Sequence, residues 1–174
     1  MKPKFFKNRY ILARAKIAFA ILLKGRVSFR KILNAAHCWF AQKFHFVKAA
    51  PFPFMINFEL WNECNAQCTF CRTDDGVIYD QNPENKGQVP IPKGKMSLDL
   101  YKEIIEQSKD HILIAVLYVN GEPLMYNGLY EAIQFASDRG VATLISTNGE
   151  LLTENNIKKL LESGLDFVKI AISG

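Results

Sequence analysis

The chain has 174 residues, with a hydrophobic fraction of 49% and a charged fraction of 22%. These values are ordinary for a globular domain, and they exclude wholesale disorder, a collagen helix and a coiled coil. The net charge of +5 conceals two opposed segments. Residues 1–50 hold 12 Lys and Arg and no Asp or Glu, whereas residues 51–174 hold 10 basic and 17 acidic residues.

We expect residues 1–50 to form a basic helical arm, with helices at about 8–24 and 28–46 separated near Gly25. Pro51 and Pro53 then mark the boundary with a second domain, 51–174. Such an arm suits a phosphate-bearing partner. We expect peripheral contact with an anionic membrane and no nucleic acid, and the alternative is that the arm packs on its own acidic body. Its apolar run, 11–23, is too short and too charged to span a membrane.

After the boundary, strand and helix patterns alternate. Strands are predicted at 54–60, 112–119, 141–146 and 167–172, and a long polar loop covers 72–95. Helices are predicted at 98–108 after the N-cap Ser97, at 127–139 before Gly140, and from the cap Thr153 to 163. Alternation of this kind predicts an α/β fold with a parallel sheet and helices outside it.

Functional residues of parallel sheets gather at the carboxyl ends of the strands. The chemically distinctive segments of this chain follow its predicted strands in that way. They are 64–71, 120–123, 146–149 and 173–174.

Three of the four cysteines, Cys64, Cys68 and Cys71, lie in one loop with C-x3-C-x2-C spacing. Such clustering indicates a metal site in a reducing compartment rather than a disulfide scaffold. Three thiolates can hold three irons of an iron–sulfur cubane and leave the fourth open for reaction. A structural zinc site would need a fourth ligand. The candidates, Cys38, His45 and His111, lack finger-like spacing.

This spacing after a first strand, with the aromatic Phe70 before Cys71, resembles the signature of radical S-adenosylmethionine (SAM) enzymes. The resemblance runs from about residue 54 to the last residue. It implies a partial (β/α) TIM-like barrel, a 4Fe–4S cluster on Cys64, Cys68 and Cys71, and SAM bound at the open iron. Reductive cleavage of SAM would give a 5′-deoxyadenosyl radical that abstracts hydrogen from an unknown substrate, either a peptide or a small molecule. A flavodoxin or ferredoxin would supply the electron.

The same resemblance implies the SAM contacts. Gly121, Glu122 and Pro123 are similar to the family's Gly-Gly-Glu motif, which binds the amino group of SAM, although Asn120 stands where the first glycine is usual. Ser146, Thr147 and Asn148 match third-strand residues that contact its ribose or carboxylate, and Ser173 matches a polar residue of the fourth strand. The plainer alternatives are a loop acid before a proline and a polar turn before a helix.

No helix or further strand is predicted after 167–172. We therefore expect the N-terminal portion of a longer oxidoreductase, poorly active and aggregation-prone alone because its last strand is an open edge. Its Gly-Glu-Pro-Leu and Ser-Thr-Asn-Gly runs resemble the SPASM-type subgroup. Two other functions stay open: a non-catalytic iron–sulfur or metal-binding protein, and a membrane-associated scaffold with a structural metal. The expected location is cytoplasmic, either free or at a membrane surface.

Overall fold

The computed structural model describes residues 17, 19, 21–46, 52–66, 68 and 93–172. Four strands form one parallel sheet in the order β1-β2-β3-β4. They are β1 (Met55–Asn57), β2 (Ile114–Val116), β3 (Ala142–Thr147) and β4 (Phe167–Ile170). The predicted α/β fold is confirmed, and each strand lies at its expected place along the chain.

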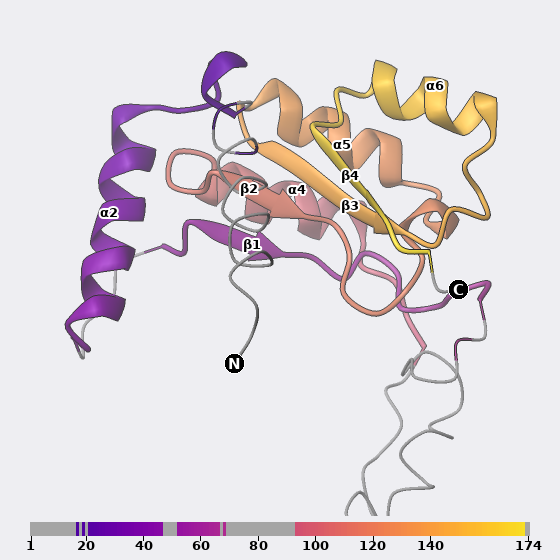
Figure 1. Cartoon of the computed structure of the whole chain (residues 1–174), viewed down its shortest axis with the longest axis horizontal. Coiled ribbons are helices and arrows are strands. Elements are labelled where there is room, and N and C mark those ends of the chain that lie inside the picture. The colour runs from indigo at the N-terminus through magenta and orange to yellow at the C-terminus, as the bar shows by residue number, and fades with distance from the viewer. Residues whose placement is uncertain are drawn as a thin grey trace, which may run out of the picture.

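The order of the strands in the sheet is their order in the chain. Because all four run parallel, their carboxyl ends lie at the same edge of the sheet (Figure 1). Pairing continues a residue beyond the short strands, because the Phe58 N–H donates to the Val116 carbonyl (2.7 Å). The Leu117 N–H donates in the same way to the Leu144 carbonyl (2.8 Å). The segments that leave β1, β2 and β3 therefore start side by side.

Three helices cover one face of the sheet: α4 (Leu98–Ser108), α5 (Leu129–Asp138) and α6 (Glu154–Glu162). The hydroxyls of Ser97 and Thr153 cap α4 and α6 by accepting from the Leu100 and Asn156 N–H groups, as predicted. Helix α5 begins two residues later than expected, because residues 127 and 128 form a turn and Gly128 is the N-cap; the 3-10 turn η2 (Pro123–Met125) precedes them. Gly140 (φ +68°) follows its end.

The main core lies between these helices and the sheet. Its fully buried members include Phe58, Tyr101, Ile105, Ala115, Leu117, Leu129, Ile133 and Ile145. The Tyr101 hydroxyl donates to the Ala132 carbonyl (3.0 Å), so the buried phenol joins α4 to α5. Burial raises the pKa of Tyr101, which keeps the donor protonated.

The opposite face is covered at its amino end by the arm. Ile21 is buried there against Ile114 and Ala142, and Ile17 and Val27 pack beside them. The arm then enters α2 (Phe29–Lys43), whose N-cap Ser28 accepts from the Lys31 N–H (3.3 Å). The helix predicted at 28–46 is thus confirmed, and residues 21–23 are helical. Most of the helix expected at 8–24 lies outside the described residues.

Cations of the arm bind the amino-terminal edge of the sheet. Asp166, whose side chain is 1% exposed, pairs with Lys24 (2.8 Å) and Arg26 (3.1 Å). Arg26 also donates to the Ser137 carbonyl (3.0 Å) at the end of α5. These cations pack on the body of their own chain, which is the alternative raised from the charge pattern.

Lys31 is buried at the same edge, where its ammonium donates to the Gly140 carbonyl (2.5 Å) and the Arg26 carbonyl (3.3 Å). Burial lowers its pKa to about 8. Among the residues described, no helix has the length and apolar character to cross a membrane. The division of the chain into domains at residue 51 stays a prediction.

Candidate active site

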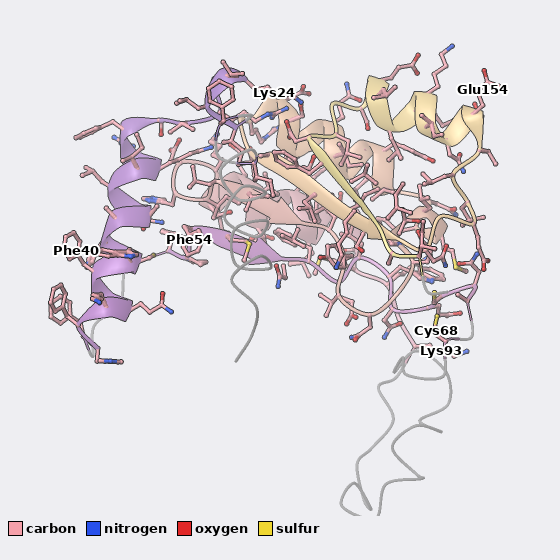
Figure 2. All side chains as sticks on the ribbon, viewed as in Figure 1. Lys24, Phe40, Phe54, Cys68, Lys93 and Glu154 are labelled. Atoms are coloured by element: carbon pink, nitrogen blue, oxygen red, sulfur yellow. The ribbon has the colours of Figure 1, made fainter. Side chains whose placement is uncertain are left out.

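The cysteine loop leaves β1 beside the segment that returns to α4. The Met96 N–H donates to the Leu60 carbonyl (3.0 Å), and Trp61 forms an antiparallel bridge with Lys95. The base of the long loop is therefore closed by backbone contacts. Figure 2 shows Cys68 near the carboxyl ends of the strands and Lys24 near the opposite, amino ends.

Of the three predicted cluster ligands, the structure describes two. Cys64 and Cys68 are half-buried, and neither forms a disulfide. Cys71, Phe70 and Ser173 lie outside the described residues, within which no three metal-ligating side chains gather. Cys38 lies on α2, where its thiol donates to the Phe52 carbonyl (3.5 Å), in keeping with a structural thiol.

Gly121 is the point where the end of β2 supports the cysteine loop. A β-carbon on residue 121 would lie 2.1 Å from the Trp61 carbonyl oxygen and 2.7 Å from that of Glu63. Both distances are far below van der Waals contact. The Glu122 N–H then donates to the same Glu63 carbonyl (2.8 Å). The residue at 121 must be glycine because the backbone of the loop occupies the place of any side chain.

Glu122 is 2% exposed, and both oxygens of its carboxylate accept backbone hydrogen bonds. Oε1 accepts from the Leu124 N–H (3.1 Å), which caps η2, and Oε2 accepts from the Asn148 N–H (2.9 Å) after β3. Pro123, the first residue of η2, is buried beside it. The carboxylate therefore ties the end of β2 to the end of β3, and each oxygen keeps a second lone pair for a ligand.

The end of β3 supplies the next polar group. The Asn148 side chain donates to Asn65 Oδ1 (2.9 Å) and, at 3.7 Å, to Cys64 Sγ. Thr147 is buried, and its hydroxyl accepts from the Gly149 N–H (3.1 Å) in the turn that follows. Ser146 is half-buried in β3 opposite Lys169 of β4. The structure thus joins Cys64, Asn148 and Glu122 through direct hydrogen bonds.

Two further contacts at this edge were not predicted from the sequence. Glu59 Oε1 accepts from the backbone N–H (3.1 Å) and the side-chain amide (2.7 Å) of Asn120, which links the ends of β1 and β2. Asn65 donates to Glu150 Oε2 (2.7 Å), which links the cysteine loop to the turn after β3. The available signal was Asn120 itself, a side chain able to donate where the family usually has glycine.

The described residues fit an iron–sulfur cluster with SAM. Two half-buried thiols stand on one loop, and a thiol at the family's spacing follows them in sequence. The buried carboxylate of Glu122 is linked to the first thiol through Asn148, so an acid suited to an ammonium group lies near the predicted cluster ligand Cys64. Soft thiolate donors are those that iron–sulfur clusters use.

Comparison with known proteins agrees with this arrangement. The family model of the Radical SAM superfamily matches residues 58–174. The chain belongs to the radical SAM superfamily.

Its relatives include enzymes named for their dependence on SAM. It is 28% identical over 120 residues to the AdoMet-dependent heme synthase of Nitratidesulfovibrio vulgaris (strain Hildenborough), a match that covers 69% of this chain and 29% of that protein. It is 30% identical over 117 residues to the S-adenosylmethionine-dependent nucleotide dehydratase of Flammeovirga pacifica, which covers 67% of this chain and 37% of that protein. The chain therefore spans about a third of the length of these relatives.

Solved structures share the fold. The crystal structure of BtrN in complex with AdoMet and 2-DOIA matches with a TM-score of 0.54 and 25% identity, covering 71% of this chain and 47% of that one. Streptococcus suis SuiB bound to the precursor peptide SuiA matches with a TM-score of 0.51 and 17% identity, covering 76% and 26%. At that identity, the likeness to SuiB concerns the fold alone.

The contact at Gly121 gives a test of the site's architecture. We expect Gly121→Ala to lower the free energy of unfolding by about 2 kcal/mol or more, because a methyl group must displace backbone rather than a flexible side chain. The measurement is urea denaturation followed by circular dichroism.

Gly94→Ala is the matched control. Gly94 also lies beside the cysteine loop, where its carbonyl accepts from the Asn62 N–H (3.3 Å), but an added β-carbon there meets no atom within 4 Å. This variant should keep its stability within about 0.5 kcal/mol. Equal losses in the two variants would show that the close approach at residue 121 is not the cause.

Proposed function

We propose that the chain carries the cluster-binding and SAM-binding site of a radical SAM enzyme. Cys64, Cys68 and Cys71 would hold a 4Fe–4S cluster, and the residues that end β2 and β3 would hold SAM. When bound, these two groups supply a 5′-deoxyadenosyl radical for hydrogen abstraction. The observation that supports this most directly is the hydrogen-bonded connection from Cys64 through Asn148 to the buried carboxylate of Glu122.

In this proposal Glu122 binds and orients the ammonium group of SAM. Its carboxylate is held by two backbone donors, so it needs no rearrangement to meet a cation. A charge-assisted hydrogen bond in a shielded place is stronger than one in water. Gly121 and Pro123 set its position from either side, and Ser146, Thr147, Asn148 and Ser173 would contribute polar contacts from β3 and β4, with Phe70 beside the cluster.

The substrate class stays broad. The similar proteins are named for heme synthesis and nucleotide dehydration, and the subgroup resemblance in the sequence keeps a peptide open as well. We therefore keep both a peptide and a small molecule as candidate substrates, with a flavodoxin or ferredoxin as electron donor. A protein that holds a cluster without turning over SAM is the competing function, and it would keep iron and sulfide but release no 5′-deoxyadenosine.

Cluster binding is tested by removing the thiols singly. We expect anaerobically reconstituted protein to hold close to one 4Fe–4S cluster, and Cys64→Ala, Cys68→Ala and Cys71→Ala each to lose most of it, because each removes the thiolate of one of the three ligated irons. Iron, sulfide and the visible spectrum are measured. Cys38→Ala is the control, since this thiol lies on α2 and contacts the Phe52 carbonyl, and the variant should keep the cluster. Loss in Cys38→Ala without loss in Cys68→Ala would contradict the assignment.

The role of Glu122 is tested by binding. Glu122→Gln should weaken SAM affinity about ten- to a hundredfold, because it loses a charge-assisted bond worth roughly 1.5–3 kcal/mol, while iron content is kept. The new amide also places an N–H₂ against a backbone donor, so thermal stability must be followed in parallel. Glu154→Gln is the control, because it removes the same charge from an exposed acid on α6 that has no part in the contacts of the site. Equal affinity losses in both variants would indicate a general effect of charge.

We also propose that α2 contacts an anionic membrane surface. Large apolar side chains on this helix and just after it face solvent: Phe29, Ile32, Leu33, Trp39, Phe40, Phe44 and Phe46. Phe40 stacks on Phe44 with ring centroids 6.0 Å apart, and the exposed cations Arg30 and Lys43 lie on the same helix. The absence of any acidic residue from 1–50 makes the charge complementary to anionic lipid.

Cosedimentation with vesicles tests this contact. We expect binding to vesicles that contain phosphatidylserine, weaker binding to phosphatidylcholine alone, and loss of binding in the double variant Phe40→Gln, Phe44→Gln. Leu161→Gln is the control, because Leu161 is a similarly exposed apolar residue (73%) on α6. Equal binding to both kinds of vesicle, or binding to neither, would contradict the contact with anionic lipid. Packing on the body of its own chain would then account for the arm.

A further inference from the structure

The side-chain amide of Asn148 is fixed in one orientation. Its Oδ1 accepts from the Glu150 N–H (2.9 Å), so the NH₂ end must point the other way, toward the cysteine loop. There it donates to Asn65 Oδ1 (2.9 Å) and to Cys64 Sγ (3.7 Å). The two N–H bonds of the amide therefore have two separate acceptors, and one of them is the sulfur of a proposed cluster ligand.

The partners of Asn148 are themselves held in place. Asn65, which accepts one N–H, donates its own amide to Glu150 Oε2 (2.7 Å). The backbone N–H of Asn148 donates to the buried Glu122 carboxylate (2.9 Å). The side chain cannot rotate without breaking its bonds to the cysteine loop and to the turn after β3, so the donor stays aimed at the sulfur.

A donor aimed at a thiolate of an iron–sulfur cluster favours the reduced state, because reduction places more negative charge on the sulfurs. The bond lies in a half-buried place, where solvent screens it less than at an open surface. We infer that Asn148, through its N–H···S bond to Cys64, is a positioning residue that raises the reduction potential of the cluster. This inference rests on the proposed function, since it requires the cluster on Cys64.

The test is a redox titration of the reconstituted protein without SAM, followed by electron paramagnetic resonance. Asn148→Leu removes the donor, adds no charge and leaves the backbone bond to Glu122 intact. We expect the equilibrium constant for one-electron reduction to fall about tenfold, a shift of about 59 mV to more negative potential. Asn127→Leu makes the same exchange at an exposed position between η2 and α5 and should leave the potential unchanged.

The outcomes separate the inference from the function on which it rests. A full cluster in Asn148→Leu with an unshifted potential overturns the inference and leaves the proposed function standing. Unaltered protein that holds no cluster overturns both. A shift of equal size in Asn127→Leu also overturns the inference, because that residue has no place at the site.

If Asn148→Leu fails to assemble the cluster, the N–H···S bond is tested by a second measurement on protein that retains Asn148. Asparagine side-chain amides are labelled with ¹⁵N, and the reduced cluster is examined by electron–nuclear double resonance. A ¹⁵N coupling that persists in Asn65→Ser supports the N–H···S bond, since the side-chain amide of Asn65, to which Asn148 is hydrogen-bonded, has been removed. Absence of any such coupling, or its loss in Asn65→Ser, overturns the inference.

Discussion

The site depends on a close backbone contact at Gly121, where there is no room for a side chain. The carbonyl oxygens of Trp61 and Glu63 occupy the space around Gly121, and the next residue donates its N–H to Glu63. The cysteine loop therefore rests on the end of β2 by backbone alone, with no flexible side chain between them. Backbone contacts of this kind leave little conformational freedom. The end of β2 therefore fixes the position of the residues just before Cys64 relative to the sheet. A loop proposed to hold a metal cluster gains from such support, because contacts with rigid elements position a site more closely than a loop alone.

Polar side chains join the carboxyl ends of the first three strands, each to that of the next. Glu59 ties β1 to β2 through Asn120, and Glu122 ties β2 to β3 through the Asn148 N–H. Each acid is satisfied by backbone or amide donors, which keeps a buried carboxylate tolerable at the edge of an apolar core. The arrangement is preorganised: the acid proposed to bind SAM is already oriented by the same strands that carry the cysteine loop. Radical chemistry gains from such rigidity, since the reacting atoms must be positioned before the radical forms.

Much of this architecture could be read from local pattern. The caps Ser97 and Thr153, the order of strands and helices, and the gathering of polar segments at strand ends all follow from short-range signals, and the structure confirms them. The late start of α5 was missed because Asn127 and Gly128, which were included in the predicted helix, form a turn, with Gly128 as the N-cap. The pairs Glu59–Asn120 and Asn65–Glu150 join residues 61 and 85 positions apart, and no local signal marks such contacts. The bond from Asn148 to Cys64 was missed for the same reason.

At the other edge of the sheet, Arg26 has consequences for the order of folding. Its partners Ser137, Val141, Gly164 and Asp166 lie 111 to 140 residues later in the chain. During synthesis, none of these groups exists when the arm leaves the ribosome, so the bonds of Arg26 are complete only after residue 166 has been made. Ile21 likewise packs on Ile114 and Ala142, so it stays uncovered until residue 142 has been made, and uncovered apolar surface of this kind favours aggregation. The contacts of the arm are long-range in sequence and form late. Most of the sheet must therefore be assembled before the arm can pack on it.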